Sequence, residues 1–306
     1  MLYGPLYFRL KNEMKTLQLT ILTIFLTQSL FGQEATTYLD KKGDKHLCGP
    51  VTIADLQQPP YEQWFQQGSN VPNLGAALTK WSKKLRDVDV EIYFGTWCGD
   101  SRHWVPRFIS MWKSLGLKED QLKLIALYGG KSRYKQGPNR EEQDKKIHRV
   151  PTFVFKESGQ EVGRIVESPS SDLVTDLAQV ALGFPSQPNY KGATYLMNLL
   201  EGSTKVDGNF EEHLGEIKYL VGKPKELNTL GYVYWYSGRQ QKALKTFYIN
   251  TLCYPFSPMA NLSYAKILEA QEDYEQSVDY YKKTLALDPD NEAATSRLKQ
   301  LESERS

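Results

Sequence analysis

The chain of 306 residues is long enough for two domains, and its hydrophobic fraction of 40% and charged fraction of 24% are typical of globular proteins. Its net charge of +2 carries no strong basic excess, which argues against a nucleic-acid-binding protein. Three cysteines are too few for a disulfide-rich scaffold, and an odd number leaves at least one thiol unpaired.

The first residues have the pattern of an export signal. Met14-Lys15 precedes an apolar run at 17–26, and Ser29 and Gly32 are small residues suited to a cleavage site. The run is about half as long as the roughly 20 apolar residues that a membrane-spanning helix needs. We therefore expect residues 1–32 to be a signal peptide that is removed from an exported protein.

Residues 33–72 are predicted to form a mixed N-terminal extension, in which Pro59-Pro60 marks a turn. Cys48 lies here in Leu47-Cys48-Gly49-Pro50-Val51, without the tryptophan or the apolar run that precedes Cys98. We expect Cys48 to be a small buried residue, and pairing with Cys98 is the alternative.

The pattern of residues 73–185 predicts an α/β domain, with a central mixed sheet flanked by helices. The predicted order is a helix at 74–85, a strand at 90–94, a helix at 101–114, strands at 122–128, 151–155 and 161–166, and a helix at 171–182. Glu157-Ser158-Gly159-Gln160 is predicted to turn the last two strands into a hairpin.

The segment Trp97-Cys98-Gly99-Asp100-Ser101 joins the strand at 90–94 to the helix at 101–114. Cys98 falls at the first turn of the helix, where unpaired backbone N–H groups and the helix dipole favour a thiolate. The position therefore predicts a nucleophilic sulfur.

Together these features resemble the thioredoxin-like superfamily, which the Trp97–Ser101 turn, Pro106 within the helix and Val150-Pro151-Thr152 before a strand all match. The resemblance implies thiol–disulfide exchange by Cys98 and a cis Val150–Pro151 peptide that faces the sulfur. It also implies substrate contacts from Trp97, Gly99, Asp100, Val150, Pro151 and Thr152. Bacterial envelope proteins carry similar turns, which implies a periplasmic or cell-envelope location.

Two residues depart from the family. Ser101 replaces the second cysteine, so it cannot resolve a mixed disulfide, although its hydroxyl could bind the thiolate. Ile92 stands where thioredoxins often bury an acid. The sequence thus predicts a monothiol protein that is released by the client's second thiol, by a small external thiol or by Cys48. The alternative is a non-catalytic interaction platform.

An insertion at 129–149 carries several lysines and arginines. We expect either a solvated loop or, if it covers the Cys98 face, a preference for acidic client proteins. The histidines His46, His103, His148 and His213 show no metal-ligand spacing, so we expect neither a metal site nor a cofactor.

Residues 186–306 are predicted to be helical. Two units, at about 224–257 and 258–291, have matching residues 34 positions apart, including Pro255 and Pro289. They resemble tetratricopeptide repeats, with a capping helix after them. The resemblance implies a concave face that recruits proteins or peptides.

Overall fold

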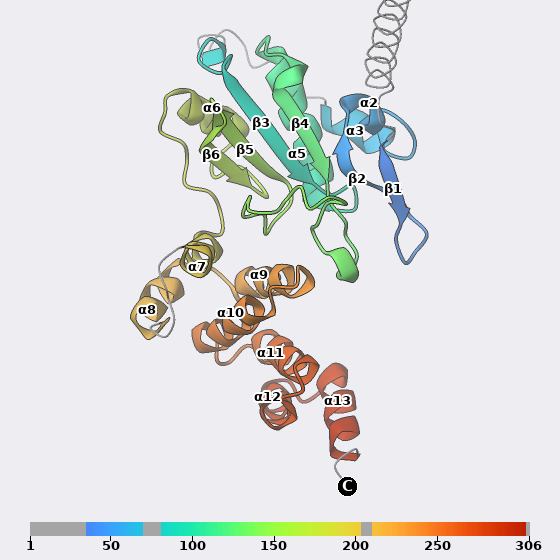
Figure 1. The fold of residues 1–306 in the computed structure, drawn as a ribbon, viewed down its shortest axis with the longest axis vertical. Helices are drawn as coiled ribbons and strands as arrows, with labels where there is room; N and C mark the ends of the chain where they lie inside the picture. Colours follow the sequence, from blue (N-terminus) through green and yellow to red (C-terminus); the bar gives the residue numbers. More distant parts are fainter. Residues whose placement is uncertain (1–34, 70–80, 203–209, 304–306) are drawn as a thin grey trace, which may run out of the picture. The chain divides into compact units, whose positions relative to one another are not determined.

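The computed structural model describes residues 35–69, 81–202 and 210–303. The predicted signal peptide and most of the helix expected at 74–85 lie outside these residues. Within them, no helix combines the length and the apolar character that crossing a membrane requires. The described chain forms a mixed sheet with helices and then a helical region (Figure 1).

The sheet of the described residues has six strands. In spatial order they are β1 (Thr36–Leu39), β2 (Lys45–Val51), β4 (Leu122–Ala126), β3 (Val88–Phe94), β5 (Thr152–Glu157) and β6 (Gln160–Val166). β3 and β4 are parallel, and all the other neighbouring pairs are antiparallel. β3 therefore lies in the interior of the sheet, and the turn at its carboxyl end starts from a buried position (Figure 1).

The parallel strands β3 and β4 are connected through α5 (Gly99–Ser114). Four residues of α5 that recur at helical spacing are all buried, namely Val105, Phe108, Ile109 and Trp112. The Phe108 ring centre lies 4.5 Å from that of Phe153 in β5, so an aromatic contact joins the helix to the sheet.

Shorter helices complete the sheet domain. They are α2 (Ile53–Leu56), α3 (Glu62–Ser69) and α6 (Leu173–Ala181), with single 3₁₀ turns at Glu119–Gln121 and Lys131–Arg133. Gly68 of α3 packs against the ring of Pro106, where a Cβ atom would have no room. Ser110 also donates a hydrogen bond to the carbonyl of Ser69 at 2.8 Å, so α3 is fastened to α5.

The hairpin predicted between β5 and β6 is present. Its two central residues, Ser158 and Gly159, have φ values of 51° and 80°. Positive φ at both positions is the requirement of a type I′ turn, whose twist matches that of the two strands.

Two strands of the sheet arise from residues 33–72, for which the sequence predicts only an extension. β2 pairs with β4 through the register Gly49–Ala126, and β1 pairs with β2. The sequence of β2 does not have the pattern typical of a strand. Pro50 interrupts the segment, and four consecutive residues, His46–Gly49, are buried. No alternation of apolar and polar residues results.

The helical region contains seven helices in the described residues. They are α7 (Lys191–Glu201), α8 (Phe210–Leu220), α9 (Pro224–Tyr236), α10 (Gln240–Cys253), α11 (Pro258–Ala270), α12 (Tyr274–Leu287) and α13 (Glu292–Ser303). Gly231 of α9 lies against the buried Phe247 ring of α10, and a Cβ atom at Gly231 would stand 2.6 Å from that ring. The small residue therefore lets the two helices approach closely.

Candidate functional site

The turn at the end of β3 places Cys98 directly before α5. Cys98 is the N-cap residue of the helix, its amide donates to Gly95 O at 2.9 Å, and its carbonyl accepts from Arg102 N at 3.0 Å. Its side chain is partly exposed and caps no helix amide. The thiol is thus left free to point away from the helix. Gly99 and Asp100, the next residues, are exposed at the helix start.

The sulfur faces the segment that the sequence predicted to lie opposite it. Cys98 Sγ lies 3.3 Å from the carbonyl oxygen of Val150, to which the thiol donates. The Val150–Pro151 peptide is cis, as the family resemblance implied. Thr152 is buried, and its hydroxyl donates to Arg149 O at 2.8 Å, which fixes the segment just before β5. Residues 52 positions apart therefore meet at one site.

The side chain of Ser101 stabilises this turn. Its side chain is fully buried, and its Oγ accepts a hydrogen bond from Gly95 N at 3.1 Å. The Ser101 hydroxyl therefore holds the backbone that leads into Cys98. Ile92, which the sequence has at the position where thioredoxins often bury an acid, is fully buried in β3.

Trp97 is fixed beside the sulfur. Its indole Nε1–H donates to Leu127 O at 2.8 Å, and its ring lies against Gly129, where a Cβ atom would stand 2.7 Å from the indole carbons. The Tyr134 ring centre lies 6.2 Å from that of Trp97. Because the indole N–H is already bound, what the tryptophan offers to a ligand is its apolar surface.

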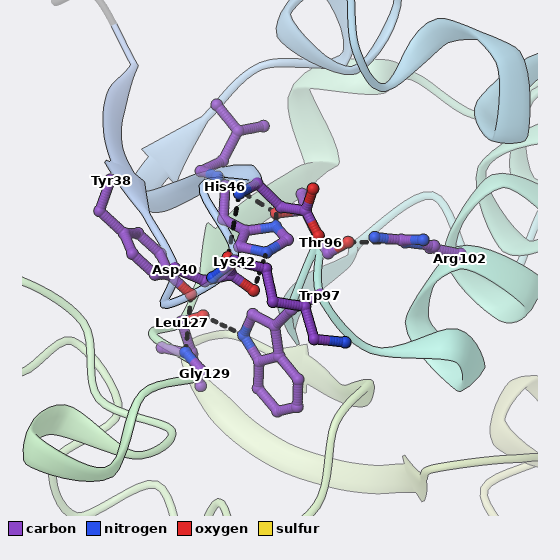
Figure 2. Close-up of polar contacts among 11 residues, drawn as sticks. Tyr38, Asp40, Lys42, His46, Thr96, Trp97, Arg102, Leu127 and Gly129 are labelled. Carbon is purple, nitrogen blue, oxygen red and sulfur yellow. Dashed lines mark hydrogen bonds and ion pairs between the residues drawn. The ribbon is translucent and has the colours of Figure 1, made fainter.

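On one side of Trp97, a cavity of about 810 Å³ opens toward the β1–β2 turn and the loop after β4. Tyr38 Oη accepts from Gly129 N at 2.7 Å, and the carboxylate of Asp40 lies 3.6 Å from Nε2 of His46 (Figure 2). Basic side chains on the lining are Lys41, Lys42, Lys131 and Arg133. The cavity therefore has a positive rim.

His46 is held on the inner side of this cavity. Its Nδ1 lies 3.3 Å from the hydroxyl of Thr96, the residue before Trp97 (Figure 2). Burial lowers the pKa of His46, although Asp40 opposes that effect. The ring thus favours its neutral form near neutral pH. The sequence did not single out Tyr38, because nothing local links it to the cysteine turn, nor Thr96, because its contact with His46 joins residues 50 positions apart.

Cys48 lies in β2 with no exposed surface, and burial raises the pKa of its thiol. Both Cys48 and Cys98 are free thiols. The expectation of a small buried residue agrees with this position. A resolving role would require the thiol to become accessible first.

The insertion at 129–149 is only partly a solvated loop. Lys135, His148 and Arg149 are buried, whereas Lys131 and Arg133 are exposed. The two nitrogens of His148 and the Nε of Arg149 are buried without a hydrogen-bond partner among the described atoms. Composition gave no signal of this burial, because lysine and arginine normally mark exposed positions.

Arg149 joins the insertion to the helical region. Its guanidinium donates to the carbonyl of Lys225 at 3.0 Å, pairs with Glu167 at 3.4 Å and lies 4.3 Å from the centre of the Tyr190 ring. Gln136 likewise donates to Tyr236 O at 2.7 Å. The residues next to the cysteine segment are therefore fastened to α9.

The predicted site residues that the fold brings together are Trp97, Cys98, Val150, Pro151 and Thr152. Cys48 is buried and has no exposed surface. Within the described ranges, no group of three or more His, Cys, Asp or Glu side chains could hold a metal ion. No protein-family model and no curated protein matches the chain.

Proposed function

We propose that this chain is an exported, thioredoxin-like monothiol protein in which Cys98 exchanges disulfides with client proteins. The observation that carries the proposal is the position of the sulfur. It lies at the N-cap of α5, is partly exposed, and stands 3.3 Å from the carbonyl oxygen of Val150.

The arrangement around the sulfur supports a thioredoxin-like fold. A strand, a helix and a parallel strand, β3–α5–β4, are followed by the antiparallel hairpin β5–β6 and by α6. This is the order that accompanies the cysteine turn in the family. Pro106 inside α5 and Pro151 before β5 occupy the matching places.

The chemistry follows from a single thiolate. Cys98 attacks one sulfur of a client disulfide, a bond forms between Cys98 and that sulfur, and the other client sulfur leaves as a thiolate. Ser101 cannot complete the cycle, since its hydroxyl is not a thiol and is bound to Gly95 N. Release therefore requires the client's own second thiol or a small external thiol. When the client's own thiol releases Cys98, the client's disulfides are rearranged, which is isomerisation.

The helical region supports recruitment of clients. α9 and α11 begin at residues 224 and 258, and α10 and α12 begin at 240 and 274, so both pairs repeat after 34 residues. That period is the tetratricopeptide period. Phe256, which is 83% exposed between α10 and α11, offers an apolar contact to a bound protein or peptide.

The experiment is a trapping assay on the full chain. A peptide with one intramolecular disulfide is incubated with the wild type, with Cys98→Ala and with Cys253→Ala, and adducts are mapped by mass spectrometry. Cys253→Ala is the control, because it removes a half-buried free thiol at the end of α10. We expect a mixed disulfide at Cys98 in the wild type and in Cys253→Ala, and none in Cys98→Ala. If all three proteins form adducts with the peptide at the same slow rate, the proposal is overturned in favour of the non-catalytic platform.

A further inference from the structure

The cavity beside Trp97 is lined in part by aromatic rings. Its volume of about 810 Å³ lies within the range of roughly 300–1,000 Å³ that ligand sites have. The Tyr38 and Tyr128 ring centres lie 4.7 Å apart, and the Trp97 indole is held in place by its hydrogen bond to Leu127 O. The three rings therefore give the cavity an apolar surface on which an aromatic side chain of a ligand can pack.

The rest of the lining is strongly basic. Among the described residues, its cations are Lys41, Lys42, Lys131 and Arg133, and its one carboxylate belongs to Asp40. With His46 neutral, four positive charges and one negative charge leave +3 on the lining, which exceeds the +2 of the whole chain. None of the four basic side chains belongs to an ion pair within the described residues. The charge that complements this lining is negative.

Asp40 does not neutralise the four cations, because its carboxylate is already bound. Its Oδ1 accepts from Lys42 N at 2.8 Å and from Asp44 N at 2.9 Å. Its Oδ2 lies 3.6 Å from Nε2 of His46 (Figure 2). These contacts fix the β1–β2 turn that carries Lys41 and Lys42, so the carboxylate serves the turn and leaves the cations to a ligand.

The loop after β4, which carries the other two cations, is fixed as well. The Tyr128 amide donates to Gln136 O at 3.0 Å, and the Lys135 amide donates to Tyr128 O at 2.8 Å, which joins the two ends of the loop. Arg133 N donates to Gly130 O, and the Arg133 guanidinium donates to the Tyr128 hydroxyl, both at 3.2 Å. Basic residues that are held in place before a ligand arrives lose less conformational freedom on binding.

The cavity adjoins the cysteine site through Trp97. Trp97 and Cys98 are consecutive residues, so their Cα atoms are about 3.8 Å apart. Both side chains also pack against one buried cluster, which includes Leu127 and Val150. A client that presents a disulfide to Cys98 therefore has the residues that flank this disulfide close to the Trp97 side of the cavity.

We propose that this cavity binds an acidic segment of the client that flanks the reacting disulfide. An aromatic side chain of the segment packs on Tyr38, Trp97 and Tyr128, and its carboxylates face the four cations. The inference rests on the exchange reaction proposed above and names its substrate class, which is client proteins with acidic and aromatic residues next to a cysteine. A basic segment is disfavoured because its charges meet cations that have no carboxylate partner.

The first test measures binding of a fluorescent peptide to the full chain by anisotropy. The peptide has no cysteine and carries one phenylalanine between two pairs of aspartates. The double variant Lys42→Glu/Lys131→Glu reverses two cations of the lining. Lys282→Glu/Lys299→Glu, the matched control, makes the same charge change at two exposed positions of α12 and α13.

We expect the wild type and the control to bind the peptide with similar affinity, and the cavity variant to bind it about tenfold more weakly. Replacing the phenylalanine with alanine, or the aspartates with lysines, should also weaken binding to the wild type. Failure of the wild type to bind, or equal affinities of the cavity variant and the control, overturns the proposal.

A second measurement locates the peptide without any variant, so it holds even if the double variant does not fold. Benzoylphenylalanine replaces the phenylalanine of the peptide, and its photo-crosslinks to the wild type are mapped by mass spectrometry. We expect crosslinks at Trp97 or within residues 38–42 and 128–133. Crosslinks confined to other parts of the chain overturn the proposal.

A third measurement separates this proposal from the exchange reaction. Two peptides with the same disulfide, one with acidic and aromatic flanks and one with basic flanks, are tested for a mixed disulfide at Cys98. We expect the acidic peptide to react faster with the wild type, and Lys42→Glu/Lys131→Glu to lose this preference. The same preference in both proteins overturns the proposal. If neither peptide forms a mixed disulfide although the cysteine-free peptide binds, the exchange reaction is refuted and the acidic-peptide site is retained.

Discussion

Replacement of Ser101 tests how the Cys98 turn is built. The Ser101 hydroxyl is fully buried and is the acceptor for Gly95 N at 3.1 Å. Ser101→Ala removes that acceptor and leaves a buried N–H without a partner, which costs about 1–3 kcal/mol. We therefore expect the free energy of unfolding to fall by about 2 kcal/mol in urea denaturation under reducing conditions.

The control is Ser132→Ala, which alters an exposed serine and should change stability by no more than about 0.5 kcal/mol. If Ser101→Ala and Ser132→Ala unfold at the same urea concentration with the same slope, the Gly95–Ser101 hydrogen bond does not hold the turn.

Ser101→Cys extends the same test to chemistry. A thiol is a weaker acceptor than a hydroxyl, so part of the stability loss should remain. The new sulfur lies three residues after Cys98, a spacing that faces the same side of a helix. We expect a mild oxidant to remove two hydrogen atoms from this variant by forming an intramolecular disulfide. With dithiothreitol present to reduce that disulfide again, we expect the variant to reduce insulin with turnover. If the Ser101→Cys protein keeps both thiols free after treatment with the oxidant, residue 101 does not occupy the resolving position.

Three further substitutions test other parts of the molecule. Gly129→Ala places a Cβ atom 2.7 Å from the Trp97 indole, so we expect a loss of about 1–3 kcal/mol in urea denaturation, and a stability equal to the wild type would show that the ring moves freely. Burial, followed by the charge of Lys135, lowers the pKa of His148 from 6.5 to about 3. Between these pH values the histidine binds a proton in the unfolded chain and not in the folded protein. The free energy of unfolding therefore falls as pH falls through that window. His148→Phe should remove this loss, at most about 5 kcal/mol, and an unchanged slope of stability against pH from 6.5 to 4 would contradict the assignment. Gly231→Ala should destabilise the helical region by about 1–2 kcal/mol because its Cβ would meet a buried ring of α10, whereas Gly215→Ala, which meets nothing within 4 Å, should be neutral or stabilising in the same thermal melt.

The elements that surround the cysteine could be predicted because their signals are local. The run at 90–94 is apolar and ends at the turn, and the helix after it repeats its apolar residues every three or four positions. The Ser158-Gly159 turn can be recognised from two residues alone. For the same reason, the 34-residue spacing of the repeats is visible without coordinates.

The N-terminal strands could not be predicted in this way. β1 is four residues long and mostly exposed, and β2 contains a proline. Both become strands because β4 offers an edge with which β2 can pair. An edge supplied by residues more than 70 positions away leaves no mark in the local pattern.

The sequence by itself determined the position of the Cys98 turn and the absence of a second thiol at Ser101, and its family resemblance indicated the segment Val150-Pro151-Thr152 as the counterpart of Cys98. Only the tertiary structure decided what surrounds the sulfur. Lys135 belongs to a segment with the composition of a surface loop, yet it is buried and its Nζ binds the carbonyl of His148, two residues before the carbonyl that Cys98 binds. The neighbouring Gln136 binds α9, so the insertion packs against the rest of the chain. Burial is a property of the whole packed chain, and it changes the chemistry of a side chain without changing a letter of the sequence.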